Sequence, residues 1–362
     1  MSRSSLLRSV MGAATVLSLT CGLTACGDDA SDGAGSGDGD TSNVTAGKAN
    51  PHAEIKKGMT IGFVPKQVSG AYFGLASQGG ERALEQLGSS FVERGPDNAT
   101  DTAGQISSIE ELKQQQVEAM AVSAQSADAL CDTLKDALGD GIKVVTYDSD
   151  TDPKCRNLFV SQAKADAIGW IQVELIAKQI DYKGEIAILS AGRDATNQNT
   201  WIKFMKEEIE SAKYGDVRLV EIAYGDDEEE KSTAETKRLL EEHPNLKGII
   251  APTTVGIKAA AAYLSDSEYK GKVKVTGLGT PNDMRTYVKD GTVEEFALWD
   301  PEKLGELAAR AAAALASGQI TGKEGQLFLA GDMGWFDIEE NGVVTLGEPT
   351  VFDKKNIDDY NF

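Results

Sequence analysis

Short apolar runs rich in β-branched residues alternate with longer amphipathic stretches through most of this chain, and this alternation limits its fold more than any other feature. The runs expected to form strands are Met59–Val64, Ala119–Val122, Lys143–Tyr147, Glu185–Ser190, Val217–Ala223, Gly248–Ala251 and Val273–Gly277. The stretches expected to form helices are Gln78–Leu87, Ala127–Leu138, Thr200–Ser211 and Glu230–Glu242. This βαβ rhythm favours parallel strands covered by helices. Because the rhythm begins a second time near residue 185, we predict an α/β protein with two doubly wound parallel-sheet lobes.

The first part of the chain lacks this rhythm and is typical of an export signal. Two arginines precede the apolar run Val10–Leu19, which is too short to remain in a membrane, since a spanning helix needs roughly twenty residues. Residues 23–26, Leu-Thr-Ala-Cys, resemble the bacterial lipobox, so we expect residues 1–25 to be removed and Cys26 to carry a lipid. Ordinary cleavage nearby is the alternative. Residues 27–50 are mostly glycine, serine and aspartate, with little to bury, and are expected to form a flexible tether.

The remaining cysteines and the net charge indicate a protein that works outside the membrane. Cys21 is expected to leave with the signal, which leaves Cys131 and Cys155 in an oxidising compartment. We expect these two to form a disulfide, with two separate buried thiols as the alternative. A net charge of −21 argues against a nucleic-acid or anionic-lipid surface, because binding phosphates requires clustered Lys and Arg.

Polar residues follow the predicted strands, where ligands bind in sheets of this kind. They are Pro65-Lys66, Asp148-Ser-Asp150, Ala191-Gly192 with Asn197-Gln-Asn199, Pro252-Thr-Thr254 and Gly279-Thr-Pro-Asn282. Carboxylates and amides offer several donors and acceptors, and one carboxylate can bridge adjacent hydroxyls, so these residues suit a sugar. The alternatives are that Asp148 only caps a turn and that Lys66 is a solvated surface lysine.

Signals for catalysis, cofactors and metals are weak. The two histidines, His52 and His243, are interpreted as surface residues and cannot build a catalytic triad or a zinc cluster. Residues 277–282 lack the last glycine of a dinucleotide fingerprint, and no phosphate-binding loop motif is present. Residues 148–152 lack the glycine and terminal glutamate of a calcium loop. The acidic run 226–230 is interpreted as a solvated helix cap. We therefore expect no enzyme activity, no cofactor and no metal.

Several motifs resemble the type I periplasmic binding proteins of bacterial ABC importers, and most closely the rhamnose-binding and autoinducer-2-binding proteins. The resemblance runs from about Met59 to Phe362. Its most specific pieces are Ile61-Gly-Phe-Val-Pro-Lys66, Thr146-Tyr-Asp-Ser-Asp-Thr151, Asn197-Gln-Asn-Thr-Trp201, Thr280-Pro-Asn282 with Arg285 and Tyr287-Val288, Gly291-Thr-Val-Glu294, Leu298-Trp-Asp300 and Val351-Phe-Asp-Lys-Lys-Asn-Ile357. Cys131 and Cys155 also fall where the autoinducer-2 proteins have cysteines.

The resemblance implies which residues surround the ligand. They are Lys66 and Asp148 from the first lobe and Asn197, Gln198, Pro252 and Thr254 from the second. The autoinducer-2 pattern has an aspartate at the position of Asn197 and an alanine at that of Thr254, whereas the Asn-Gln-Asn run is similar to the rhamnose binders. The resemblance therefore favours a deoxyhexose such as rhamnose, with autoinducer-2 as the alternative. Three aromatic rings are expected to form an apolar surface of the binding site, those of Tyr72, Phe73 and Trp299. The alternative is that these rings only pack in the core.

The resemblance also implies a hinge of three chain crossings, near residues 159–162, 297–301 and 325–332. The resulting expected division is 1–25 signal peptide, 26–55 lipidated cysteine and tether, 56–160 plus 300–324 N-terminal lobe, and 161–299 plus 325–362 C-terminal lobe. Ligand would stabilise the closed form, which is presented to an ABC permease and its ATPase. We expect a monomer held at the outer side of the cell membrane by its lipid.

Overall fold

The computed structural model describes residues 49–362, which belong to one compact unit. The expected signal peptide, Cys26 and most of the tether lie outside the described residues. Within residues 49–362, no helix is long and apolar enough to cross a membrane. The described residues include both of the βαβ series that were predicted from the sequence.

The first lobe is built on a six-stranded parallel sheet. Its strands, in spatial order, are β13 (Val343–Thr345), β5 (Leu158–Ser161), β4 (Lys143–Tyr147), β3 (Ala119–Val122), β1 (Thr60–Val64) and β2 (Ser90–Glu93). All five neighbouring pairs are parallel. Strands β1, β3 and β4 are almost entirely buried, as expected for a sheet covered on both faces.

The second lobe is built on a four-stranded parallel sheet. Its strands, in spatial order, are β7 (Asp216–Tyr224), β6 (Lys183–Ser190), β8 (Leu246–Ala251) and β9 (Lys274–Gly277). A bridge between Leu278 and Ala297 links this sheet to β10 (Glu295–Leu298), which pairs antiparallel with β14 (Thr350–Asp353). The α/β class with two parallel-sheet lobes is thereby confirmed.

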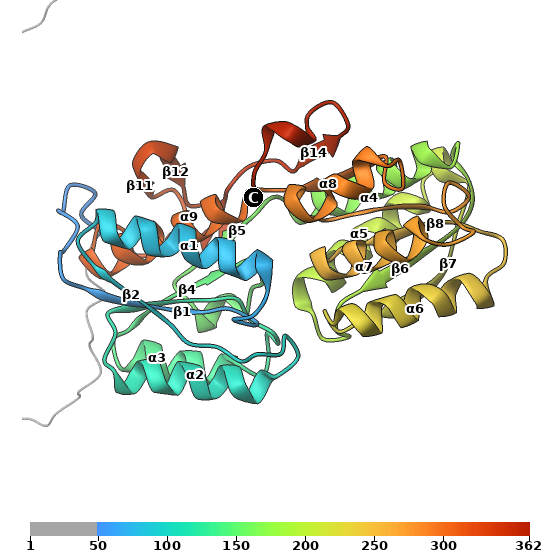
Figure 1. Cartoon of the computed structure of the whole chain (residues 1–362). Helices are drawn as coiled ribbons and strands as arrows, with labels where there is room; N and C mark the ends of the chain where they lie inside the picture. The colour runs from blue at the N-terminus through green and yellow to red at the C-terminus, as the bar shows by residue number, and fades with distance from the viewer. Residues whose placement is uncertain (1–48) are drawn as a thin grey trace, which may run out of the picture. The chain divides into compact units, whose positions relative to one another are not determined.

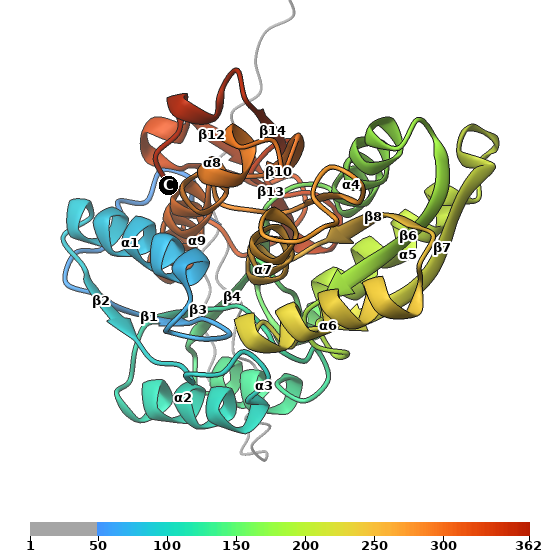
Figure 2. The same ribbon diagram turned by 45° about the vertical axis from the view of Figure 1, so that its right-hand side comes forward.

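Helices cover the sheets of both lobes (Figure 1). In the first lobe they are α1 (Ala71–Gln86) and α9 (Pro301–Ser317) on one side and α2 (Thr102–Gln114) and α3 (Cys131–Gly139) on the other. In the second lobe they are α4 (Ala165–Gln179), α5 (Thr196–Ile209), α6 (Glu229–Glu242), α7 (Thr254–Ser265) and α8 (Pro281–Lys289). Figure 2 shows α6 and α7 beside each other on the second sheet.

The end of the chain differs from the expected division into lobes. We expected residues 325–362 to lie in the second lobe, but β13 pairs with β5 of the first sheet, with Val343 opposite Phe159. The hairpin of β11 (Leu327–Leu329) and β12 (Trp335–Asp337) precedes β13. The third crossing therefore lies between β13 and β14, at residues 345–350 rather than 325–332. The first two crossings follow β5 and β10.

Close contacts and a disulfide hold the first lobe together. Helices α1 and α9 touch through glycines: a Cβ on Gly79 would overlap the carbonyl oxygen of Glu302, and one on Gly305 would overlap that of Ala76. On the other face of the sheet a separate apolar cluster packs under α2 and α3. A disulfide joins Cys131 at the start of α3 to a cysteine in the 3-10 turn η1 (Pro153–Cys155), with Cα atoms 5.3 Å apart.

Candidate functional site

A cavity of about 390 Å³ lies where the carboxyl ends of the strands of the two lobes face each other. Its lining includes the nine side chains that the sequence analysis expected around the ligand, whereas Asp150, Asn199 and Asn282, which also follow predicted strands, lie outside it. The nine are Lys66, Tyr72, Phe73 and Asp148 from the first lobe, Asn197, Gln198, Pro252 and Thr254 from the second, and Trp299 from the second crossing. The structure thus brings these nine residues together in one place.

Asp148 follows β4 and is the most heavily supported side chain of the cavity. Its carboxylate accepts hydrogen bonds from the hydroxyls of Tyr72 (3.0 Å) and Ser123 (2.8 Å) and from the amide of Asn197 (3.4 Å). The residue is 5% exposed and has a positive φ of 61°. Because its carboxylate is bonded by side chains of the cavity wall, a mere turn-capping role does not describe it. These donors fix the carboxylate before any ligand arrives.

Lys66 follows β1 and is buried, so it is not a solvated surface lysine. Its ammonium lies 3.8 Å from the Asp148 carboxylate and donates to Asn197 Oδ1 at 3.1 Å. Burial lowers the pKa of Lys66, while the negative charges of Asp148 and Asp227 oppose that shift. This lysine therefore offers ligand oxygens a poorly hydrated donor.

Asn197 and Gln198 lie in the first turn of α5, which points its N-terminus at the cavity. Gln198 Oε1 accepts from the Ser190 hydroxyl (2.7 Å) and from the backbone N–H of Ala191 (2.8 Å). Its carbonyl oxygen is thus used to fix the end of β6, and its amide NH₂ remains as the group available to a ligand. Asn197 instead bonds Lys66 and Asp148 across the cleft.

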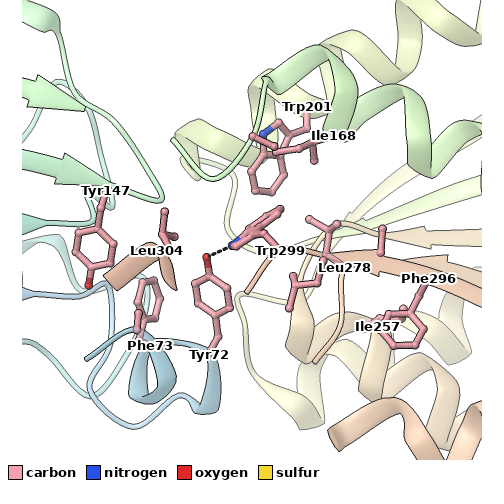
Figure 3. Packing of buried hydrophobic residues seen from close by; sticks show 14 of the residues in the cluster. Tyr72, Phe73, Tyr147, Ile168, Trp201, Ile257, Leu278, Phe296, Trp299 and Leu304 are labelled. Carbon is pink, nitrogen blue, oxygen red and sulfur yellow. Dashed lines mark hydrogen bonds between the residues drawn. The ribbon is translucent and has the colours of Figure 1, made fainter. Parts of the chain in front are cut away.

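Aromatic rings form a continuous row between the lobes (Figure 3). Trp299 Nε1 donates to the Tyr72 hydroxyl at 2.8 Å, and the two rings meet edge to face with centroids 6.2 Å apart. On the other side Trp299 lies 5.8 Å from the ring of Trp201 on α5. Phe73 packs edge to face on Tyr72 at 5.1 Å. Burial and the Asp148 carboxylate raise the pKa of Tyr72 well above its usual value, so its hydroxyl remains a donor.

Among the lining residues that sequence reasoning did not assign to the site, two bear on its chemistry, Trp201 and Asp227. Trp201 lies four residues after Asn197, and therefore on the same face of α5, which is a signal that the sequence contains. Asp227 was interpreted as part of a solvated acidic cap, which is wrong: it lines the cavity, and its carboxylate accepts a hydrogen bond from the Thr253 hydroxyl. Its place after β7 obeys the same strand-end rule that selected Asp148.

Neither of the two histidines belongs to the lining of the cavity. His243 ends α6 and contacts the Glu221 carboxylate at 2.8 Å, and His52 is exposed. Among residues 49–362, no group of three or more His, Cys, Asp or Glu side chains is arranged to hold a metal ion. The cavity is therefore best described as a polar binding site with an aromatic wall.

Residues 61–320 match the model of a protein family described as a periplasmic binding protein domain. This match covers more than half of the chain, and the chain therefore belongs to the type I periplasmic binding protein family. Its homologues are substrate-binding proteins of sugar ABC transporters and not enzymes.

Solved structures similar to this chain include three sugar or signal binders. One is a sugar ABC transporter protein from Actinomyces odontolyticus, 45% identical, with a TM-score of 0.69, covering 84% of this chain and 98% of that one. A second is a solute-binding protein from Clostridium phytofermentas with bound L-rhamnose, 36% identical, with a TM-score of 0.81 and the same coverage of 84% and 98%. A third is LsrB from Clostridium saccharobutylicum in complex with AI-2, 26% identical, with a TM-score of 0.79, covering 84% and 100%.

Proposed function

We propose that this chain is the lipid-anchored solute-binding protein of an ABC sugar importer. It captures a small polyol such as rhamnose between its lobes and delivers it to the permease. The observation that carries the proposal is the meeting of Lys66 and Asp148 from one lobe with Asn197 from the other in a cavity that also has an aromatic wall. Acceptors and donors around an apolar surface suit the hydroxyls and the nonpolar face of a sugar.

The preference for a deoxyhexose rests on two positions of the second lobe. Asn197 provides an amide where the autoinducer-2 pattern has a carboxylate, and Thr254 adds a hydroxyl where that pattern has an alanine. Unpaired buried polar groups cost about 1 to 3 kcal/mol each, so these exchanges change which ligand fits. The apolar edge formed by Phe73, Tyr72 and Trp299 would accept the methyl group of a deoxy sugar. Similarity to the L-rhamnose-bound protein supports this choice.

The mechanism that follows is closure of the two lobes around the ligand. Three chain crossings link the lobes, and the bonds of Asn197 to Lys66 and Asp148 span the cleft. A ligand that contacts both walls adds interactions only in the closed form and shifts the population toward it. The closed pair of lobes then offers the permease a surface that the open pair lacks. This cycle needs no cofactor and no chemical step.

The cellular setting is part of the same proposal. Lipid on Cys26 and the tether of residues 27–50 would hold the body outside the membrane and beside the permease. We propose that the protein acts as a monomer and that nucleic acid is not a partner, consistent with its net charge of −21.

A thermal-shift and calorimetric panel tests the ligand class on residues 49–362, which belong to one compact unit. The panel contains L-rhamnose, other pentoses and hexoses, and autoinducer-2. A true ligand at a hundredfold excess over its Kd adds about 2.7 kcal/mol to the free energy of unfolding. We expect the largest stabilisation from L-rhamnose or a similar deoxyhexose. If no polyol stabilises the protein, the sugar-binding proposal fails.

The alternative is an autoinducer-2 binding protein for uptake or signalling. It is favoured by the overall similarity to the AI-2-bound LsrB. The resemblance to the autoinducer-2 pattern also implies Lys66 and Asp148 as ligand-binding residues. The same panel separates the two proposals, because tighter binding of autoinducer-2 than of every sugar would replace the first proposal by the second.

A further inference from the structure

Asp227 differs from its neighbours in the acidic run that follows β7. Asp226 forms an ion pair with Lys231. Glu228 accepts a hydrogen bond from Asn98 at 3.2 Å, and Glu229 lies in the first turn of α6, where acidic side chains suit the helix dipole. Asp227 and Glu229 both line the cavity, but Asp227 has neither an ion-pair partner within residues 49–362 nor a place in that helix.

One oxygen of the Asp227 carboxylate is held and the other is available. Oδ1 accepts the hydroxyl of Thr253, a buried residue that precedes α7 and is 7% exposed. No hydrogen bond to Oδ2 comes from another described residue. A carboxylate with one oxygen fixed by the protein and a second oxygen without a donor is arranged to accept hydrogen bonds from something else in the cavity.

The charged groups of the opposite wall act on the Asp227 carboxylate, which lines the same cavity. Burial raises the pKa of Asp227, and the Lys66 ammonium partly offsets that shift. The Asp148 carboxylate adds to it by repulsion. The negative charges of both carboxylates in turn raise the pKa of Lys66, against the larger lowering by burial. One carboxylate from each lobe thus acts on the charge of the lysine, and all three side chains line the same cavity.

The backbone supports the same interpretation. Asp226 and Asp227 both have left-handed conformations, with φ of 52° and 54°. Such conformations are unfavourable for residues other than glycine, although Asp and Asn tolerate them best. Two in succession turn the chain sharply at the end of β7. Strained backbone of this kind is concentrated at binding and active sites.

We propose that Asp227 is a ligand-binding residue of the second lobe, that it accepts hydrogen bonds from ligand hydroxyls, and that with Asp148 it restricts the site to neutral polyhydroxylated ligands. The inference rests on the proposed function and extends it. Asn197 lacks the carboxylate of the autoinducer-2 pattern, and Asp227 supplies one from the same lobe at a different place. A sugar acid would bring its own carboxylate between two others and be rejected, since like charges in a poorly hydrated cavity repel strongly.

The test is Asp227→Asn, with Asp226→Asn as the matched control, in calorimetric titrations of the lipid-free chain with L-rhamnose and the other panel sugars. Asparagine has the same shape and tolerates the same backbone conformation. A hydrogen bond to a charged group contributes about tenfold to a hundredfold to affinity, so Asp227→Asn should weaken binding by that factor. Asp226→Asn should change it less than about twofold, because the exposed Asp226–Lys231 pair lies at the surface.

Two further readouts distinguish a binding role from a structural one. The melting temperature of ligand-free Asp227→Asn should be equal to or above that of the wild type at neutral pH, because the variant removes a charge whose burial is unfavourable. Affinity in the wild type should fall as the pH drops through the raised pKa of Asp227, and this part of the pH dependence should be missing in Asp227→Asn. D-glucuronate should not bind the wild type.

Each result decides the inference. If the wild type binds a sugar and Asp227→Asn binds it equally well, Asp227 is not a ligand residue, while the proposed function stands. If Asp227→Asn binds weakly but also melts far below the wild type, its role is structural and the inference is wrong. If the wild type binds no polyol at all, the proposed function and the inference fall together.

Discussion

The two walls of the cavity are held in place in different ways. On the first wall, the Asp148 carboxylate is bonded by Tyr72 and Ser123, both from its own lobe. On the second wall, the side chain of Asn197 is bonded by Lys66 and Asp148 from the opposite lobe, and within its own lobe its Oδ1 accepts the backbone N–H of the next residue, Gln198, at 2.9 Å. The Asp148 carboxylate therefore keeps two side-chain donors when the lobes separate, whereas Asn197 loses both of its side-chain partners. We infer that the first lobe binds the ligand initially. The side chains of the second lobe then contact the ligand during closure and select among ligands.

Additional braces behind the first wall explain its rigidity. The guanidinium of Arg156 donates to both oxygens of Asp150 at 2.6 and 2.7 Å and to the backbone oxygen of Asn341 at 2.9 Å. This buried pair joins the loop after β4 to the turn before β13, and the disulfide to Cys155 fixes the same loop. Within the second lobe, the described hydrogen bonds to the Asn197 side chain amount to one, from the backbone N–H of Gln198. Preorganisation of one wall lowers the entropy cost of binding there.

The largest expected effect is that of Asp148→Asn, which tests whether the first wall dominates affinity. The variant keeps the shape and tolerates the positive φ of 61° but removes the charge that ligand hydroxyls would contact. We expect affinity for the best panel ligand to fall at least about a hundredfold, or about 2.7 kcal/mol, measured by calorimetry. The control is Asp132→Asn, an exposed aspartate of the same lobe that should leave affinity unchanged. Binding within threefold of the wild type would contradict a dominant first wall.

A smaller effect is expected for Tyr72→Phe, which removes one donor to Asp148 and the acceptor of Trp299. Because Trp299 lies in the second crossing, its bond to Tyr72 links the crossing to the binding carboxylate. We expect about a tenfold loss of affinity for Tyr72→Phe and a smaller loss for Trp299→Phe. If Trp299 acts through Tyr72, the double variant should lose less than the two single variants together.

The change in tryptophan fluorescence upon ligand addition is a second measurement of the link between the second crossing and Asp148. Trp170→Phe is the control, since that ring is 44% exposed and lies on α4, away from the cavity lining. Its ligand-induced signal should match that of the wild type, whereas Trp299→Phe should reduce it. Additive losses in the double variant would mean that the two rings contribute independently and that the crossing is not linked to Asp148.

The sequence could predict residues whose place follows from a local pattern, but not contacts between segments that lie far apart in the chain. Lys66 and Asp148 follow strands with clear apolar patterns, so the strand-end rule located them. Strand β13 has only three residues and pairs with β5 far away in the chain, so no local pattern indicated that Val343 belongs to the first sheet. The bond from Trp299 to Tyr72 spans 227 positions and was equally out of reach. Asp227 was missed for another reason, because acidic residues before a helix have a common structural explanation.

The smallest expected change in total affinity is that of Asn197→Asp, which tests the second wall through selectivity. Asn197→Asp places a carboxylate beside Lys66 but also near Asp148, from which the Asn197 amide lies at 3.4 Å. Attraction to the Lys66 ammonium and repulsion from the Asp148 carboxylate partly cancel, so the total affinity should change little. The arrangement of ligand hydroxyls that the site can bind should change, because an acceptor replaces an amide that can also donate. Combined with Thr254→Ala, Asn197→Asp should shift the ratio of the L-rhamnose and autoinducer-2 dissociation constants by about tenfold toward autoinducer-2. Val255→Ala, at the next position in the lining, is the control for an equally small truncation. An unchanged ratio would mean that the second wall closes over any ligand that Asp148 has bound, and that selection takes place on the first wall alone.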